Sequence, residues 1–185
     1  MTTTEPNIPG YVSGTWSLDP AHTEIGFVVR HLMVSKVRGH FEKYTASITT
    51  SANPFESHAE AQIDLSSIST GNDQRDGHLR SSDFFDVDTH PTMTFRSTGF
   101  RRGGDEFFLD GDLTIRGVTR PTTLTVEIGG FGPDPYGGKR AGFSATAEIN
   151  RTDFGVNWNA AIEGGGAVVS DKVTINIEAE AVLDT

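Results

Sequence analysis

The stretch VTINIEAEAVL, residues 173–183, decides the fold class because apolar and polar side chains alternate along nearly all of it. Successive side chains of a β-strand point to opposite faces, so this pattern indicates a half-buried antiparallel strand with one dry face. The predicted dry face carries Val173, Ile175, Ile177, Ala179, Ala181 and Leu183, and the wet face carries Thr174, Asn176, Glu178 and Glu180.

The same period of two recurs along most of the chain. The alternation is clear in four further segments, residues 23–33, 105–115, 122–128 and 142–150. It is weaker in another four, residues 15–18, 36–50, 59–68 and 92–100. Glycine-rich or proline-rich segments at 101–106 and 132–139 have the composition of hairpin turns. Together these segments predict an all-β protein of about eight or nine antiparallel strands.

Residues 72–81 form the one segment that favours a helix. Asn72 is a suitable N-cap, and Asp73 and Asp76 lie in the first turn, where the helix dipole favours negative charge. Gly77 weakens this preference. We therefore predict a single short helical connector at about residues 72–81.

Length and charge restrict the classes of function. A chain of 185 residues is expected to form one domain, here a barrel at 14–185 behind a flexible leader at 1–13. A net charge of −10 argues against nucleic-acid partners and disfavours docking on anionic lipid headgroups. No run approaches the roughly 20 apolar residues that a membrane helix needs, and the start lacks the pattern of a signal peptide. We expect no stable membrane insertion and a cytoplasmic location.

Motifs for metal binding and catalysis are missing from the sequence. There is no Cys, no His-x-x-x-His pair and no Gly-x-Ser-x-Gly motif. The sequence therefore predicts no metal site, no cofactor and no catalytic residue. One alternative stays open, because Asp86, Asp88 and His90 would share a face and could bind a cation if this segment were extended.

Strands with a single dry face must pack as a sandwich or close into a barrel. An eight-stranded barrel is just wide enough to hold one ligand when its lining is small. The predicted dry faces do contain small residues, namely Gly111, Ala145, Ala147, Ala179 and Ala181. Because small residues also suit a tapered, filled barrel, the alternation leaves both a ligand cavity and a solid core open.

Five segments resemble, in the same order, those of the YceI-like family of polyisoprenoid-binding proteins. They cover nearly everything from about Gly14 to Leu183 and read GTWSLDPAHTEIGFVVRHLMVSKVRGHF, NDQRDGHLRSSDFFDVDTHPTMTFRST, GDLTIRGVTRPTTLTVEIGGFG, INRTDFGVNW and VSDKVTINIEAEA. The resemblance implies a lipocalin-like antiparallel barrel around a long apolar chain, such as a polyprenyl phosphate or an isoprenoid quinone. Many members of the family carry a secretion signal, and this sequence shows none.

A chain-like ligand needs an apolar tunnel with a few polar groups at one end. The candidates for the tunnel lining are apolar residues of the predicted dry faces, namely Phe27, Val29, Met33, Phe41, Ile63, Leu65, Met93, Phe95, Leu113, Leu124, Phe143, Ile149 and Ile175. Each of them is equally compatible with an ordinary barrel core. Trp158 either packs at the mouth of the tunnel or plugs it. His31 is in phase with Phe27 and Val29, so it either points into the cavity or is a buried, hydrogen-bonded histidine.

The charged segment 70–91 is the candidate for the polar end. His78 is the predicted contact to a phosphate or a quinone carbonyl, whereas Arg75 and Arg80 either join it or pair with nearby aspartates. Phe84 and Phe85 are predicted to anchor this connector against the barrel.

The principal hypothesis is non-enzymatic binding of an isoprenoid lipid, for carriage, storage or sensing. One alternative is a filled barrel that acts through protein partners. Another is a small hydrolase or isomerase that uses the 72–90 loop. An exposed edge strand would also allow two barrels to pair, which leaves a homodimer open.

Overall fold

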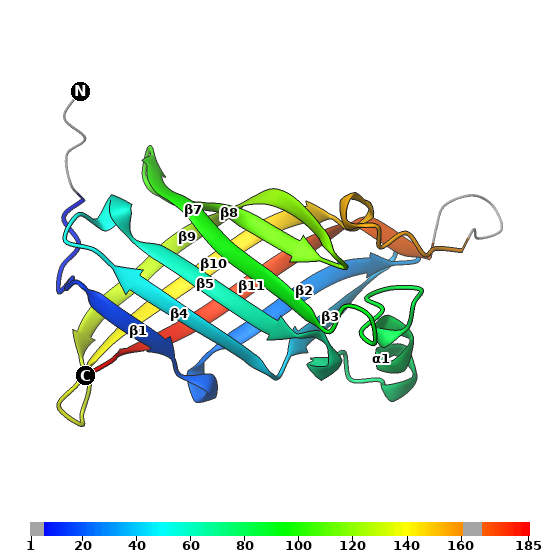
Figure 1. Ribbon diagram of the computed structural model, residues 1–185, viewed down its shortest axis with the longest axis horizontal. Helices are drawn as coiled ribbons and strands as arrows, with labels where there is room; N and C mark the ends of the chain where they lie inside the picture. The colour runs from blue at the N-terminus through cyan, green and yellow to red at the C-terminus, as the bar shows by residue number, and fades with distance from the viewer. Residues whose placement is uncertain (1–5, 161–167) are drawn as a thin grey trace.

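A computed structural model describes residues 6–160 and 168–185, which form an antiparallel barrel with one helix at one end (Figure 1). Eight strands close the ring because β11 pairs with β1 as well as with β10. The prediction of a single eight-stranded barrel is confirmed. In ring order the strands are β1 (Gly14–Leu18), β4 (Tyr44–Thr50), β5 (His58–Asp64), β7 (Thr92–Gly103), β8 (Glu106–Ile115), β9 (Val118–Pro133), β10 (Lys139–Asn150) and β11 (Val169–Leu183).

Three more strands extend the wall beyond β1 and β4. They are β2 (Glu24–His31), β3 (Ser35–Phe41) and β6 (Ile68–Ser69), paired in the order β11, β2, β3, β6. Both β1 and β2 pair with β11, so they continue one line of the wall across a short break. The described part of the chain also contains four 3-10 helices between the strands, namely η1 (Pro20–His22), η2 (Pro54–Glu56), η3 (Leu65–Ser67) and η4 (Arg151–Phe154).

Helix α1 (Asp73–Arg80) follows β6 in the chain and lies at one end of the barrel (Figure 1). The Asn72 side chain accepts a hydrogen bond from the Arg75 amide at 2.9 Å, which confirms the predicted cap and helical connector. The helix is tied to the sheet edge by Arg80, which donates to the carbonyl oxygens of Ser66 and Ile68 at 2.9 and 3.2 Å. In the described ranges, no helix has the length and apolar character needed to cross a membrane.

The segment after α1 folds back against the barrel in a series of turns. Phe84 is buried and Phe85 packs against the same core, so both lie where an anchor is expected. The amides of Thr89 and His90 both donate to the Asp86 carbonyl, at 3.0 and 2.8 Å. Because the segment forms this turn, it is not extended. The condition under which Asp86, Asp88 and His90 would share one face is therefore not met.

The opposite end of the barrel is closed by aromatic side chains. Trp16 is fully buried, and its indole N–H donates to the Thr50 hydroxyl at 2.9 Å. The Tyr11 ring meets Phe131 edge to face at 5.3 Å, and its hydroxyl donates to the Ser51 carbonyl at 2.6 Å. Tyr11 and Val12 therefore contact the barrel, and residues 1–5 of the predicted leader lie outside the described residues.

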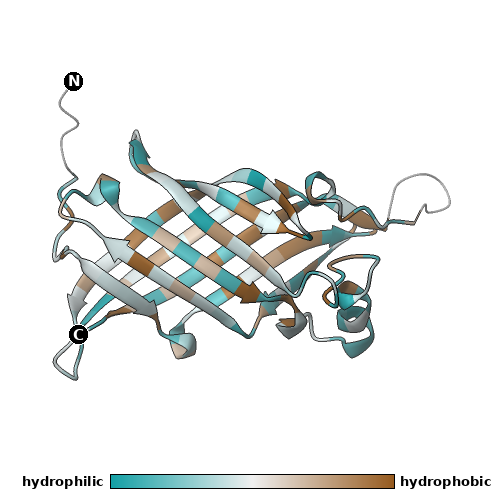
Figure 2. Cartoon of the chain, viewed as in Figure 1, coloured by the Kyte–Doolittle hydropathy of each residue, from teal (hydrophilic) through white to brown (hydrophobic). Residues whose placement is uncertain are grey.

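Hydrophobic and hydrophilic residues alternate in bands along the strands (Figure 2). Because successive side chains of a strand point to opposite faces, this alternation sorts them between the interior and the solvent. Cross-strand partners bring apolar side chains together on the inner face. Phe27 pairs with Ile175, and Ala61 pairs with Phe95. The sequence pattern thus gives the barrel an apolar lining.

Candidate ligand-binding cavity

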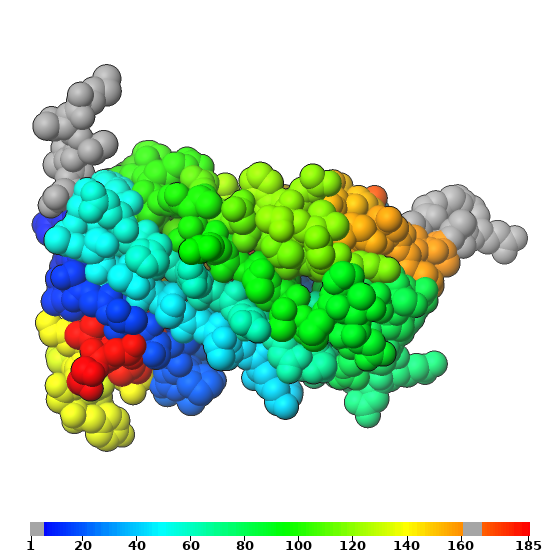
Figure 3. Space-filling model, in the orientation of Figure 1, coloured from blue at the N-terminus to red at the C-terminus, as the bar shows by residue number. Residues whose placement is uncertain are grey.

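The barrel interior holds two apolar cavities of about 180 Å³ each. One lies toward α1 and the other toward the chain termini. The two cavities adjoin at a shared ring of side chains, which consists of Ile25, Ala61, Phe95, Leu124 and Ile177. Together the cavities therefore follow the barrel axis. Side chains cover the wall on the face seen in Figure 3. We call the two cavities together the tunnel.

Most of the tunnel candidates identified from the sequence line these cavities. The section toward α1 is lined by Phe27, Val29, Phe41, Ile63, Met93, Phe95, Leu113, Leu124, Ile149 and Ile175. Phe143 lines the section toward the termini. Their common inward parity explains this placement, because each lies on the dry face of its strand.

Met33 and Leu65 were predicted to line the tunnel, but the structure places both elsewhere. Strand β2 ends at His31, whose carbonyl accepts from the Val34 amide at 3.2 Å, so Met33 lies in an exposed hairpin turn. Leu65 is fully buried but belongs to η3, which begins because the Asp64 side chain accepts from the Ser66 amide at 3.0 Å. Its side chain packs in the core and does not line the tunnel.

A largely apolar recess with several polar side chains among its lining residues opens between α1 and the hairpin of β2 and β3. Its volume is about 370 Å³, and it shares Phe27, Val29 and Leu79 with the tunnel. Polar side chains and Trp158 form its rim, and these are Arg30, His31, Asn72, Gln74, Arg75 and His78. We call this recess the mouth. It brings together the two predicted histidines and the predicted tryptophan.

Side chains of α1 are held in place around the mouth. The Nε2 atom of His78 lies 2.8 Å from a carboxylate oxygen of Asp83, and the imidazole ring meets Trp158 edge to face at 4.8 Å. Arg75 donates from Nε to the Thr70 hydroxyl and from Nη2 to the Thr70 carbonyl, both at 2.8 Å. Oxygen atoms of Thr70 thus hold this guanidinium, for which the sequence had left both a head-group contact and a pairing with aspartates open.

Arg151 is a buried charge beside the tunnel that the sequence did not reveal. Its Nη1 atom donates to the carbonyls of Val156 and Trp158 at 2.9 and 2.8 Å, and its Nε donates to the Ser170 carbonyl at 2.9 Å. Burial lowers the pKa of the guanidinium, and Asp171 at 3.5 Å opposes that shift. Arg151 therefore fastens the segment that carries Trp158 to the start of β11.

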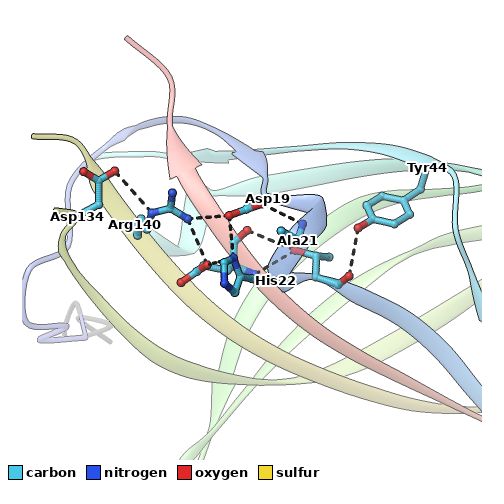
Figure 4. A network of polar contacts seen from close by, with 8 residues as sticks. Asp19, Ala21, His22, Tyr44, Asp134 and Arg140 are labelled. Atoms are coloured by element: carbon cyan, nitrogen blue, oxygen red, sulfur yellow. Dashed lines mark hydrogen bonds and ion pairs between the residues drawn. The ribbon is translucent and has the colours of Figure 1, made fainter. Parts of the chain in front are cut away.

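A second polar cluster lies on the outside of the barrel, where η1 meets β10 and β11 (Figure 4). Arg140 donates from Nη1 to Asp19 at 2.8 Å and to Glu180 at 3.2 Å. The same two carboxylate oxygens lie 2.9 and 3.1 Å from Nδ1 of His22. Hydrogen bonds from Arg140 and His22 hold the pKa of Asp19 well below its usual range, and the hydrogen bond to Asp19 raises the pKa of His22. This network fixes the break between β1 and β2.

We expect His22→Gln to destabilise the protein more in mild acid than in mild alkali. Because the pKa of His22 is raised in the folded state, its contribution is complete below the unfolded pKa of about 6.5 and is lost as the pH rises through the folded pKa. Thermal unfolding midpoints of both proteins across this range test the expectation. His40→Gln is the control, because the His40 ring lies farther from a carboxylate than the His22 ring does, at 3.8 Å from that of Glu42. A pH-independent difference between wild type and His22→Gln would contradict it.

Comparison with known proteins identifies the family. The model of the YceI-like domain matches residues 16–181. The UPF0312 protein SAB2563 of Staphylococcus aureus (strain bovine RF122 / ET3-1) is 38% identical over 167 residues, which cover 89% of this chain and 95% of that protein.

Solved structures show the same barrel. The YCEI protein of Campylobacter jejuni is 34% identical with a TM-score of 0.73, and the match covers 91% of this chain and 97% of that one. BcnA of Burkholderia cenocepacia is 25% identical with a TM-score of 0.75, covering 88% and 98%. A polyisoprenoid binding domain from Saccharophagus degradans shares the fold at 19% identity and a TM-score of 0.65, covering 91% and 98%. With its family model matched over most of its length, this chain belongs to the YceI-like domain family.

Proposed function

We propose that this protein binds a long-chain isoprenoid lipid inside its barrel, with no chemical turnover. The observation that carries the proposal is an apolar tunnel along the barrel axis that adjoins a mouth where polar side chains gather. This arrangement matches a ligand with a long apolar tail and a small polar head. The shared fold with a domain described as polyisoprenoid binding supports the same ligand class, which includes polyprenyl phosphates and isoprenoid quinones.

The length of the barrel limits the length of the tail. Strand β11 has 15 residues, which at about 3.3 Å per residue and a tilt of about 40° span roughly 38 Å along the axis. An extended chain advances about 3.3–3.6 Å per three backbone bonds, and an isoprene unit contributes about four such bonds. The tunnel therefore accepts at most about eight extended isoprene units.

The polar head belongs at the mouth. The opposite end of the barrel is closed by Trp16, Tyr11 and Phe131, whose rings leave an apolar surface there. The mouth instead carries Arg75 and two histidines among its lining residues. Guanidinium and imidazole groups donate hydrogen bonds to phosphate or quinone oxygens, so they provide the head-group contacts.

Two other functions fit the structure less well. A filled barrel would lack the two cavities, because protein cores pack with few voids larger than a water molecule. A hydrolase built on the 72–90 loop would need a free acid or base. Asp76 is buried and accepts from the Thr70 amide and hydroxyl at 2.9 and 2.5 Å, and His78 is paired with Asp83. The buried contacts of Asp76 support a structural role for that side chain.

Titration with an isoprenoid quinone tests the proposal and the orientation of the ligand. The chain has two tryptophans, Trp158 at the mouth and Trp16 at the closed end. We expect saturable quenching of tryptophan fluorescence in the wild type, because a quinone ring at the mouth lies beside Trp158. Trp16→Phe keeps this quenching and Trp158→Phe loses most of it, although both variants still bind the lipid.

Two outcomes would contradict the proposal in different ways. Linear quenching without saturation would show that the protein does not bind the quinone. Quenching that is lost in Trp16→Phe and kept in Trp158→Phe would place the head at the opposite end. A quinone without the isoprenoid tail is the control, and we expect it to bind far more weakly because it buries little apolar surface.

A further inference from the structure

The tip of the hairpin between β2 and β3 exposes three consecutive apolar side chains. Leu32, Met33 and Val34 are 38%, 60% and 83% exposed. Across the described ranges, the other large apolar side chain with such exposure is Tyr136, which is 87% exposed. Single exposed apolar residues are ordinary on protein surfaces, but a contiguous group marks a contact surface.

The backbone of this tip is strained by the residues it contains. Leu32 and Met33 have φ angles of 53° and 60°, a left-handed conformation that bulky side chains rarely adopt. Hairpin turns whose two central residues have positive φ angles strongly favour Asn-Gly or Asp-Gly at those positions. The turn is held by the hydrogen bond from Val34 to His31 and by a bond from the Leu32 amide to the Val168 carbonyl at 2.9 Å. The left-handed backbone at Leu32 and Met33 lowers stability, and a sequence that accepts this loss indicates a role for the tip beyond folding.

Basic side chains flank the tip on the outer face of the hairpin. Arg30 lies directly opposite Lys36, and Arg38 follows two positions along the same face. All three are exposed. Like charges directly opposite each other on a sheet are destabilising, so this arrangement is a second cost at the same place. It also makes one part of a chain with net charge −10 locally positive.

Two of the three acidic groups near the tip are paired with basic ones. Glu148, Asp153 and Asp171 line a surface recess together with Met33. Glu148 lies 3.7 Å from the Lys172 ammonium group, and Asp171 lies 3.5 Å from the Arg151 guanidinium. These pairings reduce the negative charge that the tip presents.

The tip stands beside the mouth. It lies at the end of the barrel that carries α1, and both Arg30 and His31 line the mouth (Figure 1). We propose that Leu32–Val34, with Arg30, Lys36 and Arg38, docks the protein on the surface of an anionic lipid bilayer. The apolar side chains enter the boundary between headgroups and acyl chains, and the basic side chains contact the anionic headgroups.

Docking at this point would bring the mouth to the membrane. The purpose of docking, exchange of the isoprenoid lipid, rests on the proposed function, whereas the docking itself does not. The net charge of −10 opposes adsorption through other faces, so the tip also sets the orientation. The expectation that the acidic chain avoids anionic headgroups therefore does not extend to this end of the barrel.

Vesicle sedimentation with turn variants tests this inference. We expect the wild type to bind vesicles made of equal parts phosphatidylcholine and phosphatidylglycerol, and to bind phosphatidylcholine vesicles much less. Added salt weakens the binding, because exposed charges are screened. The double variant Leu32→Asn/Met33→Gly, which has the sequence this turn favours, is expected to melt at a higher temperature and yet bind vesicles at least about tenfold more weakly.

Charge and position are tested separately. The double variant Lys36→Gln/Arg38→Gln, which leaves the residues of the mouth unchanged, should lose at least about tenfold in binding to the anionic vesicles. Tyr136→Ser is the matched control, since it removes an exposed apolar side chain in the loop between β9 and β10 at the other end of the barrel. We expect it to bind as the wild type does. Wild-type protein that stays in the supernatant, or a double variant that binds as well as the wild type, would overturn the docking proposal.

A quinone titration of the same variants in solution separates the two proposals. Retained quinone binding with lost vesicle binding supports a docking role for the tip. Vesicle binding that depends on the tip, in a protein that binds no quinone, would support docking and refute the proposed ligand.

Discussion

Ala61→Trp is expected to weaken isoprenoid binding by about 100-fold, which corresponds to about 2.7 kcal/mol. Ala61 lies in the ring of side chains where the two cavities adjoin, and it pairs with Ala46 on one side and Phe95 on the other. An indole at this position fills the junction, so an extended tail no longer passes from one section to the other. Equilibrium titration with the isoprenoid quinone measures the effect.

The neighbouring outward position supplies the control. Gln62 is exposed on the outer face of β5, and Gln62→Trp places the same ring on the same strand without entering the tunnel. We expect its affinity for the quinone to match that of the wild type. Equal affinities of Ala61→Trp and the wild type, with both proteins folded, would show that the ligand does not cross the junction.

Phe84→Ala is expected to lower the free energy of unfolding by about 3 kcal/mol, as is typical for the loss of a buried aromatic side chain. The Phe84 ring packs in a core cluster with Leu113 and Phe154, and it lies 5.3 Å from the ring of Trp158. Its carbonyl accepts a hydrogen bond from Arg116 at 2.6 Å. Loss of the ring therefore removes packing from the segment after α1 while the backbone contact stays available. Urea denaturation measures the change.

Phe108→Ala serves as the comparison for Phe84→Ala. Phe108 is partly exposed on β8, where the Arg101 guanidinium lies 4.7 Å from its ring centroid. We expect a loss of about 1 kcal/mol there, because less apolar surface leaves water. If Phe84→Ala cost no more than Phe108→Ala, Phe84 would not anchor the connector.

Strand alternation predicted the barrel and most of the tunnel lining. The dry faces of β8 and β11 were identified from their parity alone, and that parity places Leu113 and Ile175 at the cavity. The helix was predicted from its Asn72 cap, which forms the expected hydrogen bond. These features depend on residues close together in the sequence, so local patterns are sufficient to find them.

Features that depend on distant backbone atoms escaped prediction. Arg151 is buried because carbonyls at 156, 158, 169 and 170 surround it, and no side-chain motif marks that environment. The turn at Leu32 and Met33 lacks the glycine or asparagine that usually indicates a hairpin. The alternating pattern therefore predicted a strand that continued to Met33. The break at η3 depends on the side chain of Asp64, which accepts from the Ser66 amide.

The most direct measurement is a mass spectrum of the organic extract from protein purified out of its own host. We predict a polyprenyl species, a phosphate or a quinone, at close to one molecule per barrel and with at most about eight isoprene units. Protein that yields no lipid, even after incubation with isoprenoid quinones and polyprenyl phosphates, would contradict the account of the tunnel as an isoprenoid-binding site.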